Sequence, residues 1–255
     1  MESDRPRNLF CLFQSRDRTR IISMNNQGTF NQIDDQSLIN SRYTPLVNHF
    51  DESITEEGEM RPHWDLINKS LGGLGPGEVE HKINELNQQL KNNGVSYNVY
   101  KDGKVHDTIW PLDPIPAIYT SSEWAKIERG LVQRAEILSA VFTDLYGSQK
   151  LIKDKIIPAE LVYGSPDFLY PCVNLPINTE KSLPFVASDL VRDVDGEIKV
   201  LADRTQTPSG VGYALENRII LSQTLPTLYR DSNVHRLANF FRILKSTIRK
   251  SAPKG

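Results

Sequence analysis

Three stretches of the chain repeat apolar residues every three or four positions, which is the spacing of one face of an α-helix. The first follows Gly75 and stops at Asn93-Gly94, where glycine permits a left-handed turn. The second begins at the capping box Thr120-Ser-Ser-Glu123 and ends at Gly147. The third covers residues 234–250. The stripes of these expected helices are Val79, Ile83, Leu86 and Leu90; Trp124, Ile127, Leu131, Ala135, Leu138, Phe142 and Leu145; and Leu237, Phe241, Leu244 and Ile248.

Alternating apolar and polar residues predict two β-hairpins. In the first, a strand at residues 95–100 runs into the turn Lys101-Asp-Gly-Lys104. In the second, the strands Phe185–Arg192 and Glu197–Asp203 are joined by Asp193-Val-Asp-Gly196. Asp-Gly is typical of tight hairpin turns because both residues tolerate a positive φ. We therefore expect antiparallel pairing in both places.

Three further segments complete the expected organisation. Residues 158–163 are interpreted as a strand that runs into the turn at 164–166. Residues 110–116 contain three prolines, which fix φ and remove backbone donors, so we expect an extended connector there. Residues 1–42 are polar without apolar periodicity and are expected to form a disordered tail. The combination of helices with antiparallel strands favours an α+β fold.

The charge balance narrows the classes of partner. The 255 residues include 30 Lys and Arg against 32 Asp and Glu, so the formal net charge is −2. Binding to nucleic acid phosphates needs a basic surplus, so this balance argues against nucleic acid as a partner. No run approaches the ~18 consecutive apolar residues of a membrane span, and no segment has the pattern of an export signal. We expect a cytoplasmic protein with no membrane span.

The helix expected at residues 234–250 carries only basic charges from Arg236 onward. An amphipathic helix of this kind can bind an anionic membrane surface. The favoured interpretation is that its apolar stripe packs on the core and its basic face is solvated, because acidic residues elsewhere in the chain compensate its charge.

The cysteines and histidines show no spacing that predicts a metal site. Cys11 and Cys172 lie far apart and form no Cys-x-x-Cys pair, so we expect both to be reduced and buried. The histidines lack the His-x-x-x-His spacing of a metal-binding helix. A bound metal would therefore use carboxylates. The histidines are His49, His63, His81, His106 and His235.

The second hairpin carries two acidic residues that could hold a divalent cation. Asp189 lies on its first strand and Asp203 ends its second strand. Carboxylates on adjacent strands can share Mg²⁺ if both face the same side. Asp189 lies among apolar residues, so its charge needs a partner. The alternative is that Asp189 pairs with a nearby arginine, either Arg204 or Arg218.

The second strand leads directly into Pro208-Ser-Gly210, and a helix pattern follows as far as Ser222. The backbone N–H groups at a helix N-terminus favour an anion such as phosphate. Glycines at 210 and 212 would permit close approach of a ligand to the backbone. A turn of this composition also serves as ordinary helix capping, so both interpretations remain open.

Seven runs of residues, in this order along the chain, resemble the circularly permuted type 2 ATP-grasp family. They extend from about residue 60 to the end of the chain and leave the tail unmatched. The runs are Pro62–Trp64, Asn93–Tyr100, Trp110–Pro116, Glu123–Gly147, Ile157–Leu169, Asp189–Asp193 and Thr207–Arg218.

The resemblance implies a ligase that uses ATP to activate a carboxylate as an acylphosphate, which an amine then attacks. ATP and Mg²⁺ are the implied cofactors, and a small peptide or amino acid is the implied substrate. Arg204 becomes the candidate catalytic residue, with Asp189 and Asp203 as the candidate metal ligands. The residues that we expect to bind the nucleotide are Arg204, Thr205, Gln206, Ser209, Gly210, Asn217 and Arg218.

The chain departs from related ATP-grasp ligases in its expected metal ligands. Those ligases carry Glu and Asn in the slots that Ala202 and Arg204 occupy here. Asp203 lies one residue off and should face the opposite side of the strand, because side chains alternate. Arg204 either neutralises phosphate in place of the cation or marks a site that has lost catalysis. A non-catalytic binding or scaffold module is therefore the alternative function.

Members of this family continue beyond the equivalent of Gly255 into segments that cover the nucleotide. The resemblance therefore implies that residues 43–255 form the N-terminal part of a permuted ATP-grasp domain, incomplete at its C-terminus. It also implies that the missing C-terminal half of the same protein is the partner of this part.

Overall fold

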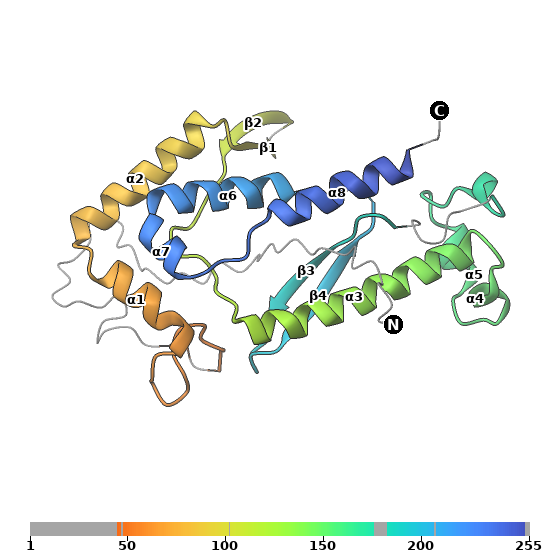
Figure 1. Ribbon diagram of the computed structural model, residues 1–255. Helices are drawn as coiled ribbons and strands as arrows, with labels where there is room; N and C mark the ends of the chain where they lie inside the picture. The colour runs from red at the N-terminus through yellow and green to blue at the C-terminus, as the bar shows by residue number, and fades with distance from the viewer. Residues whose placement is uncertain (1–44, 47, 102, 176–182, 207, 253–255) are drawn as a thin grey trace, which may run out of the picture.

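The computed structural model has helices and two short antiparallel sheets, which confirms the expected α+β class (Figure 1). The residues that it describes are 45–46, 48–101, 103–175, 183–206 and 208–252. The expected tail and Cys11 lie outside them. The elements are η1 Pro62–Trp64, α1 Asp65–Gly72, α2 Pro76–Asn92, β1 Ser96–Lys101, β2 Lys104–Ile109, α3 Ser121–Leu145, α4 Lys150–Lys153, α5 Ala159–Tyr163, η2 Tyr170–Cys172, β3 Ala187–Arg192, β4 Ile198–Arg204, α6 Val211–Thr224, α7 Pro226–Asp231 and α8 Ala238–Ser251.

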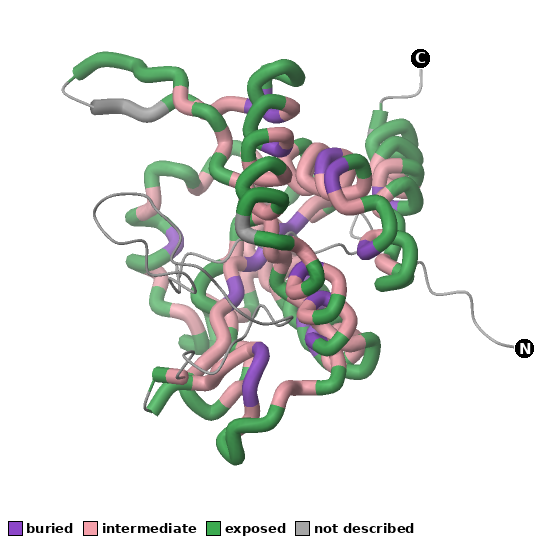
Figure 2. The backbone as a smooth tube through the Cα atoms, turned by 90° about the vertical axis from the view of Figure 1, so that its left-hand side faces the viewer, coloured by how far each residue is buried: buried purple, intermediate pink, exposed green. Residues whose placement is uncertain are grey.

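Most buried apolar side chains of the described residues form three separate clusters, and Figure 2 shows buried stretches spread along the backbone. One cluster joins α1 to α7, a second joins α2 to α6, and a third joins α3 to the β3–β4 hairpin. Each of these clusters therefore joins elements that lie far apart in the sequence. Among the described residues, no helix is long and apolar enough to cross a membrane.

The α2–α6 cluster follows the predicted pattern of the first helix. Leu86 and Leu90 of α2 are fully buried against Ile220 of α6. Gly94 ends the helix in the left-handed conformation, with φ of 65°, as its position after Asn93 predicts. The connector that follows β2 brings the Trp110 ring onto Tyr213 of α6, with ring centroids 4.3 Å apart.

The long helix α3 begins where the capping box predicts. The Thr120 hydroxyl accepts a hydrogen bond from the Glu123 amide at 3.2 Å. The Glu123 carboxylate, in contrast, binds Arg192 at 2.6 Å. Burial along the predicted stripe ends early: Ile127, Leu131 and Ala135 are buried, whereas Leu138, Phe142 and Leu145 are only half-buried.

The β3–β4 hairpin forms as predicted, and its turn and register decide which side chains share a face. Asp193 N donates to Glu197 O at 2.9 Å, and only Gly196 of the described turn residues has a positive φ, of 81°. Asp189 pairs with Ala202 and the next pair is Leu190 with Val200, so Leu201 is an extra residue in a β-bulge. In Figure 1 the hairpin lies between α3 and α8.

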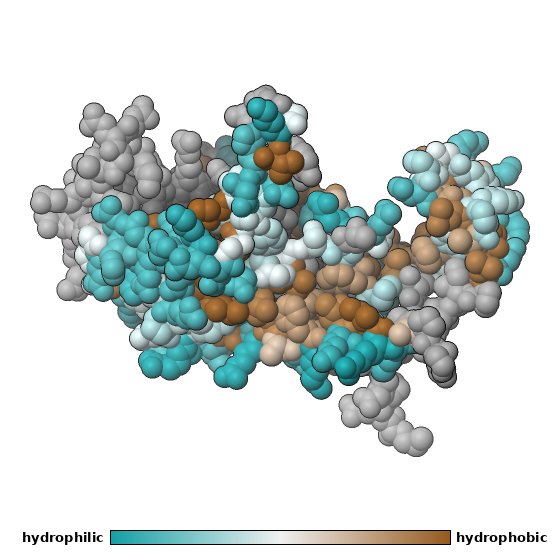
Figure 3. Space-filling model, turned by 90° about the horizontal axis from the view of Figure 1, so that it is seen from above, coloured by the Kyte–Doolittle hydropathy of each residue, from teal (hydrophilic) through white to brown (hydrophobic). Residues whose placement is uncertain are grey.

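Residues 158–163 were predicted to form a strand, and this prediction is wrong, because residues 159–163 form the helix α5. Pro158 precedes the first turn, where proline is tolerated, and Ala-Glu-Leu favour helix. Cys172, expected to be buried, is only half-buried in η2. The lobe built by α4, α5 and η2 stands apart at the right of Figure 3 and shows apolar residues on its surface. Leu161 of α5 and Tyr170 of η2 are among its exposed residues.

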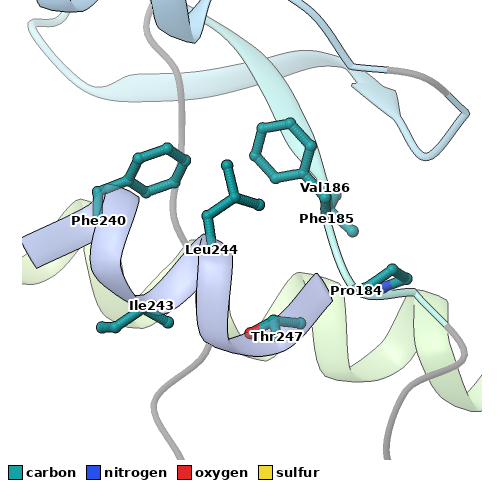
Figure 4. Close-up of a pocket in the computed structure, with 7 residues that line it drawn as sticks. All are labelled: Pro184, Phe185, Val186, Phe240, Ile243, Leu244 and Thr247. Atoms are coloured by element: carbon teal, nitrogen blue, oxygen red, sulfur yellow. The ribbon is translucent and has the colours of Figure 1, made fainter. Parts of the chain in front are cut away.

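The most buried residue of the last helix, α8, is Phe240, which is not part of the predicted stripe, although Leu244 of that stripe packs beside it. Phe240 is 5% exposed, and its ring lies 6.0 Å from that of Phe185, ahead of β3. Figure 4 shows Leu244 beside these two rings. Ile248, which belongs to the predicted stripe, is exposed. The opposite side of α8 presents basic side chains, including Arg242, Lys245 and Arg249.

Candidate functional site

Asp189 and Arg204 form an ion pair across the open end of the β3–β4 hairpin. The Arg204 Nη2 atom donates to Asp189 Oδ2 at 2.8 Å, and Nε lies 3.5 Å from Oδ1. The side chain of Arg204 is 50% exposed, whereas that of Asp189 is 22% exposed. Arg204 therefore meets solvent on one side and the carboxylate on the other, which matches the alternative in which Asp189 pairs with a nearby arginine.

Asp203 lies on the opposite face of the hairpin, as strand alternation predicts. It pairs across the ladder with Ser188, whose hydroxyl lies 2.8 Å from Asp203 Oδ1. The other carboxylate oxygen accepts from Arg134 Nε of α3 at 2.6 Å. The bulge at Leu201 permits this arrangement, because it lets Val200 and Asp203 both face α3. The two candidate metal ligands are therefore not brought together.

The described residues at this end of the hairpin do not fit a Mg²⁺ ion. Asp189 is engaged by a permanently charged guanidinium, and its cross-strand neighbour is Ala202, which offers no ligand atom. Asp203 is held by Arg134 on the other face. No group of three His, Cys, Asp or Glu side chains among the described residues could share a metal ion.

The residues between β4 and α6 are exposed and lead from Arg204 to a helix N-terminus. Thr205, Gln206 and Ser209 are exposed. Gly210 precedes α6 with φ of 105°, a conformation that favours glycine. The first backbone bond of the helix runs from Ala214 N to Gly210 O at 3.1 Å, and the N-cap residue Gly210 has no side chain that could cap α6. The first N–H groups of a helix have no partner within the helix, so this turn can offer donors to an anion.

Asn217 and Arg218, the other predicted nucleotide-binding residues, point elsewhere. Arg218 Nη1 donates to the backbone oxygen of His235, which ties α6 to the segment ahead of α8. The Oδ1 atom of Asn217 is buried and has no hydrogen-bond partner among the described residues. Within the described part of the chain, neither side chain forms a hydrogen bond with Asp189 or Arg204.

A second arginine of the same hairpin, Arg192, is the centre of a network that the sequence did not predict. Its Nε and Nη1 atoms lie 2.6 Å from carboxylate oxygens of Glu52 and Glu123, respectively. Its guanidinium carbon lies 4.8 Å from the centroid of the Phe50 ring and 5.4 Å from that of Tyr119. Arg192 therefore fastens the segment before α1 to the turn end of the hairpin.

Burial also changes the titration of two groups beside this network. Burial lowers the pKa of the His63 imidazole below its ordinary value of 6.5, and the carboxylates of Glu123 and Glu52 only partly offset this. Burial, reinforced by Glu52, raises the pKa of the Tyr119 hydroxyl far above its ordinary value. These groups share a desolvated environment that Arg204 does not have.

A model of the family described as circularly permuted ATP-grasp type 2 matches residues 116–255. The matched region begins just ahead of α3 and includes β3, β4, α6 and α8. Both members of the Asp189–Arg204 pair therefore lie within it.

Longer relatives match most of this chain. Protein sll0335 of Synechocystis sp., described as uncharacterised, is 34% identical over 207 residues, which are 81% of this chain and 43% of that protein. Rv2567 of Mycobacterium tuberculosis, also described as uncharacterised, is 28% identical over 212 residues, which are 80% of this chain and 24% of that protein. A second mycobacterial protein, Rv2411c, is 28% identical over 203 residues, and the chain covers 36% of it. The chain spans less than half the length of each of these relatives.

Proposed function

Because the chain belongs to the circularly permuted ATP-grasp type 2 family, we propose that it contributes the phosphate-binding part of an ATP-dependent carboxylate-amine ligase. In this proposal the guanidinium of Arg204 contacts the phosphates of ATP. The chain spans less than half the length of its relatives, so the complete reaction is proposed for polypeptides of the relatives' length.

The observation that carries the proposal is the exposure and position of Arg204. Its guanidinium is half-exposed at the end of β4. Seven residues later, the first turn of α6 begins at Val211 and offers backbone donors. An arginine fork and a helix N-terminus both bind phosphate oxygens well. Thr205, Gln206 and Ser209 are exposed between them and could add hydroxyl and amide contacts to the same anion.

The proposed reaction has two steps. A carboxylate oxygen of the substrate attacks the γ-phosphorus of ATP, the bond to the bridging oxygen breaks, and ADP leaves. The amine nitrogen of the second substrate then attacks the acyl carbon, inorganic phosphate leaves, and the nitrogen loses one proton to solvent. Arg204 would neutralise negative charge on the transferred phosphoryl group. The substrates are proposed to be amino acids or a small peptide.

A non-catalytic binding or scaffold module is the second candidate function. It is favoured by the pairing of Asp189 with Arg204 and by Ala202, because neither arrangement supplies the oxygen ligands that Mg²⁺ prefers. A module of this kind would bind a nucleotide or another phosphate compound without transferring a phosphoryl group.

Release of ADP and nuclear magnetic resonance (NMR) together test these two candidates. ADP release is measured for this chain and for its Synechocystis relative, with ATP and with or without a mixture of amino acids. A non-hydrolysable ATP analogue is titrated into the isotope-labelled chain in parallel. Release that requires the amino acids, with chemical shift changes between Arg204 and Gly210, supports the ligase. Chemical shift changes without ADP release from either protein support the non-catalytic module. If neither chemical shift changes nor ADP release is seen, the proposal is contradicted.

A further inference from the structure

The Asp189–Arg204 pair combines a fixed acceptor with a movable donor. Asp189 projects from a strand whose backbone is paired along its length, and its short side chain has little freedom. Arg204 is the last residue of β4, and its longer side chain is half-exposed. The guanidinium can therefore turn from the carboxylate to an anion in solvent while the backbone stays in place.

Within the described part of the chain, Arg204 has one negative partner, the carboxylate of Asp189. Ala202, the cross-strand neighbour of Asp189, carries no charge. Asp203 is directed to the opposite face, where Arg134 and the hydroxyl of Ser188 bind it. A phosphate that approaches from solvent therefore competes with the carboxylate of Asp189 for the same fork of N–H donors.

We infer that Asp189 is an internal competitor for the phosphate site of Arg204, and that phosphate binding at this pair does not require a divalent cation. This inference rests on the proposed phosphate contact of Arg204. The free chain holds the guanidinium on Asp189, and phosphate binds by taking it over. Asp189 thus weakens the affinity for phosphate instead of supporting it through a metal.

The inference reverses the effect expected for a metal ligand. If Asp189 held Mg²⁺, Asp189→Asn would weaken phosphate binding and remove its dependence on Mg²⁺. If Asp189 competes for Arg204, the same substitution removes the competing charge and strengthens binding. Exposed ion pairs are weak, so the expected gain in affinity is about two- to fivefold.

The probe is inorganic tripolyphosphate, which carries the phosphate chain of ATP without the nucleoside. The Nε–H resonance of Arg204 is followed by NMR while tripolyphosphate is raised to about 10 mM, a range that detects millimolar affinity. Each titration is run with EDTA and again with Mg²⁺ in excess. The variants are Asp189→Asn and Arg204→Ala. Asp203→Asn is the matched control, because it removes an acidic charge from the opposite face of the same hairpin.

The inference predicts that the unaltered chain binds tripolyphosphate in EDTA, that Asp189→Asn binds it two- to fivefold more tightly, and that Asp203→Asn leaves the affinity unchanged. Arg204→Ala has no Nε–H resonance at residue 204, so its binding is followed by the chemical shifts of the backbone amides near Gly210. These shifts should show that this variant no longer binds tripolyphosphate. Binding that appears only with Mg²⁺, or that Asp189→Asn weakens, overturns the inference but keeps the phosphate role of this end of the hairpin. If no variant responds to tripolyphosphate, the proposed phosphate contact of Arg204 fails as well.

Discussion

The two ends of the β3–β4 hairpin each carry an arginine bound to carboxylate, but in opposite environments. At the turn end, the side chain of Arg192 is 10% exposed, binds Glu52 and Glu123, and lies against the rings of Phe50 and Tyr119. At the open end, Arg204 is 50% exposed and binds one carboxylate. The residue type is the same, and the number of partners and the contact with solvent differ.

This difference separates a stabilising role from a binding role. A desolvated arginine with two carboxylates cannot leave them without exposing two partly buried negative charges to an apolar environment. A half-exposed arginine with one carboxylate can exchange that partner for another anion, because water stabilises both groups during the exchange. The turn end therefore fastens the fold, and the open end is where we propose that an anion binds.

The largest effect is expected at the turn end. Arg192→Ala leaves Glu52 and Glu123 without their shared cation and removes the contacts with both rings. We expect the free energy of unfolding to fall by about 2–4 kcal/mol, somewhat below the range for fully buried pairs, because both carboxylates are partly exposed. Urea denaturation followed by circular dichroism measures the change. Arg192→Lys keeps the positive charge but not the paired N–H donors of the guanidinium, so its free energy of unfolding should fall less than that of Arg192→Ala. A fall below about 0.5 kcal/mol in Arg192→Ala would contradict the structural role of this arginine.

An intermediate effect is expected from His63, beside the same network. Burial places the pKa of His63 in the folded protein below its ordinary value of 6.5, so protonation favours the unfolded chain. This contribution to stability is present above the ordinary pKa and is lost as the pH falls through the pKa of the folded state.

Comparison with His63→Gln isolates this contribution. As the pH is lowered from about 7.5 to about 5.5, the urea concentration at the unfolding midpoint should decrease for the unaltered chain and should decrease less for His63→Gln. The charged groups that surround His63 are Glu52, Arg61, Glu123 and Arg192. Equal slopes for the two proteins would show that His63 is not desolvated.

The smallest effect on stability is expected at the open end. Arg204→Ala breaks one exposed ion pair, so the melting temperature should fall by only about 1–3 °C, less than for Arg192→Ala. Differential scanning calorimetry of Arg204→Ala and Arg192→Ala under the same conditions gives the comparison directly. A decrease for Arg204→Ala as large as that for Arg192→Ala would assign both arginines the same structural role.

Most regular elements could be predicted because their signals are local. The capping threonine of α3, Gly94 after α2, and Gly196 in the second hairpin each act within one turn of chain. The failure at α5 is also local, because five residues are too few to show the period of a helix. The buried face of α8 was misplaced by one residue, from Phe241 to Phe240, because contact with Phe185 selects the face.

The candidate site also has one part that could be predicted from the sequence and one part that could not. The ion pair of Asp189 and Arg204 was among the alternatives, because the hairpin pattern puts both residues at one end of two paired strands. The network of Arg192 could not be predicted, since Glu52 lies 140 residues away along the chain and no repeated pattern connects them. Nothing in the local sequence distinguishes Arg192 from Arg204, although their environments differ.

The bulge at Leu201 has a consequence for sequence alignment. Leu201 is the residue without a partner in the ladder, and its side chain is 63% exposed. A homologue that lacks one residue here can keep the pairs Asp189–Ala202 and Ser188–Asp203, because an ungapped strand would join the same partners. In a sequence alignment made by counting positions from Asp189, the homologue's arginine that corresponds to Arg204 would then be aligned with the wrong residue of this chain. An insertion or deletion at this position should therefore be placed by strand pairing, not by residue number.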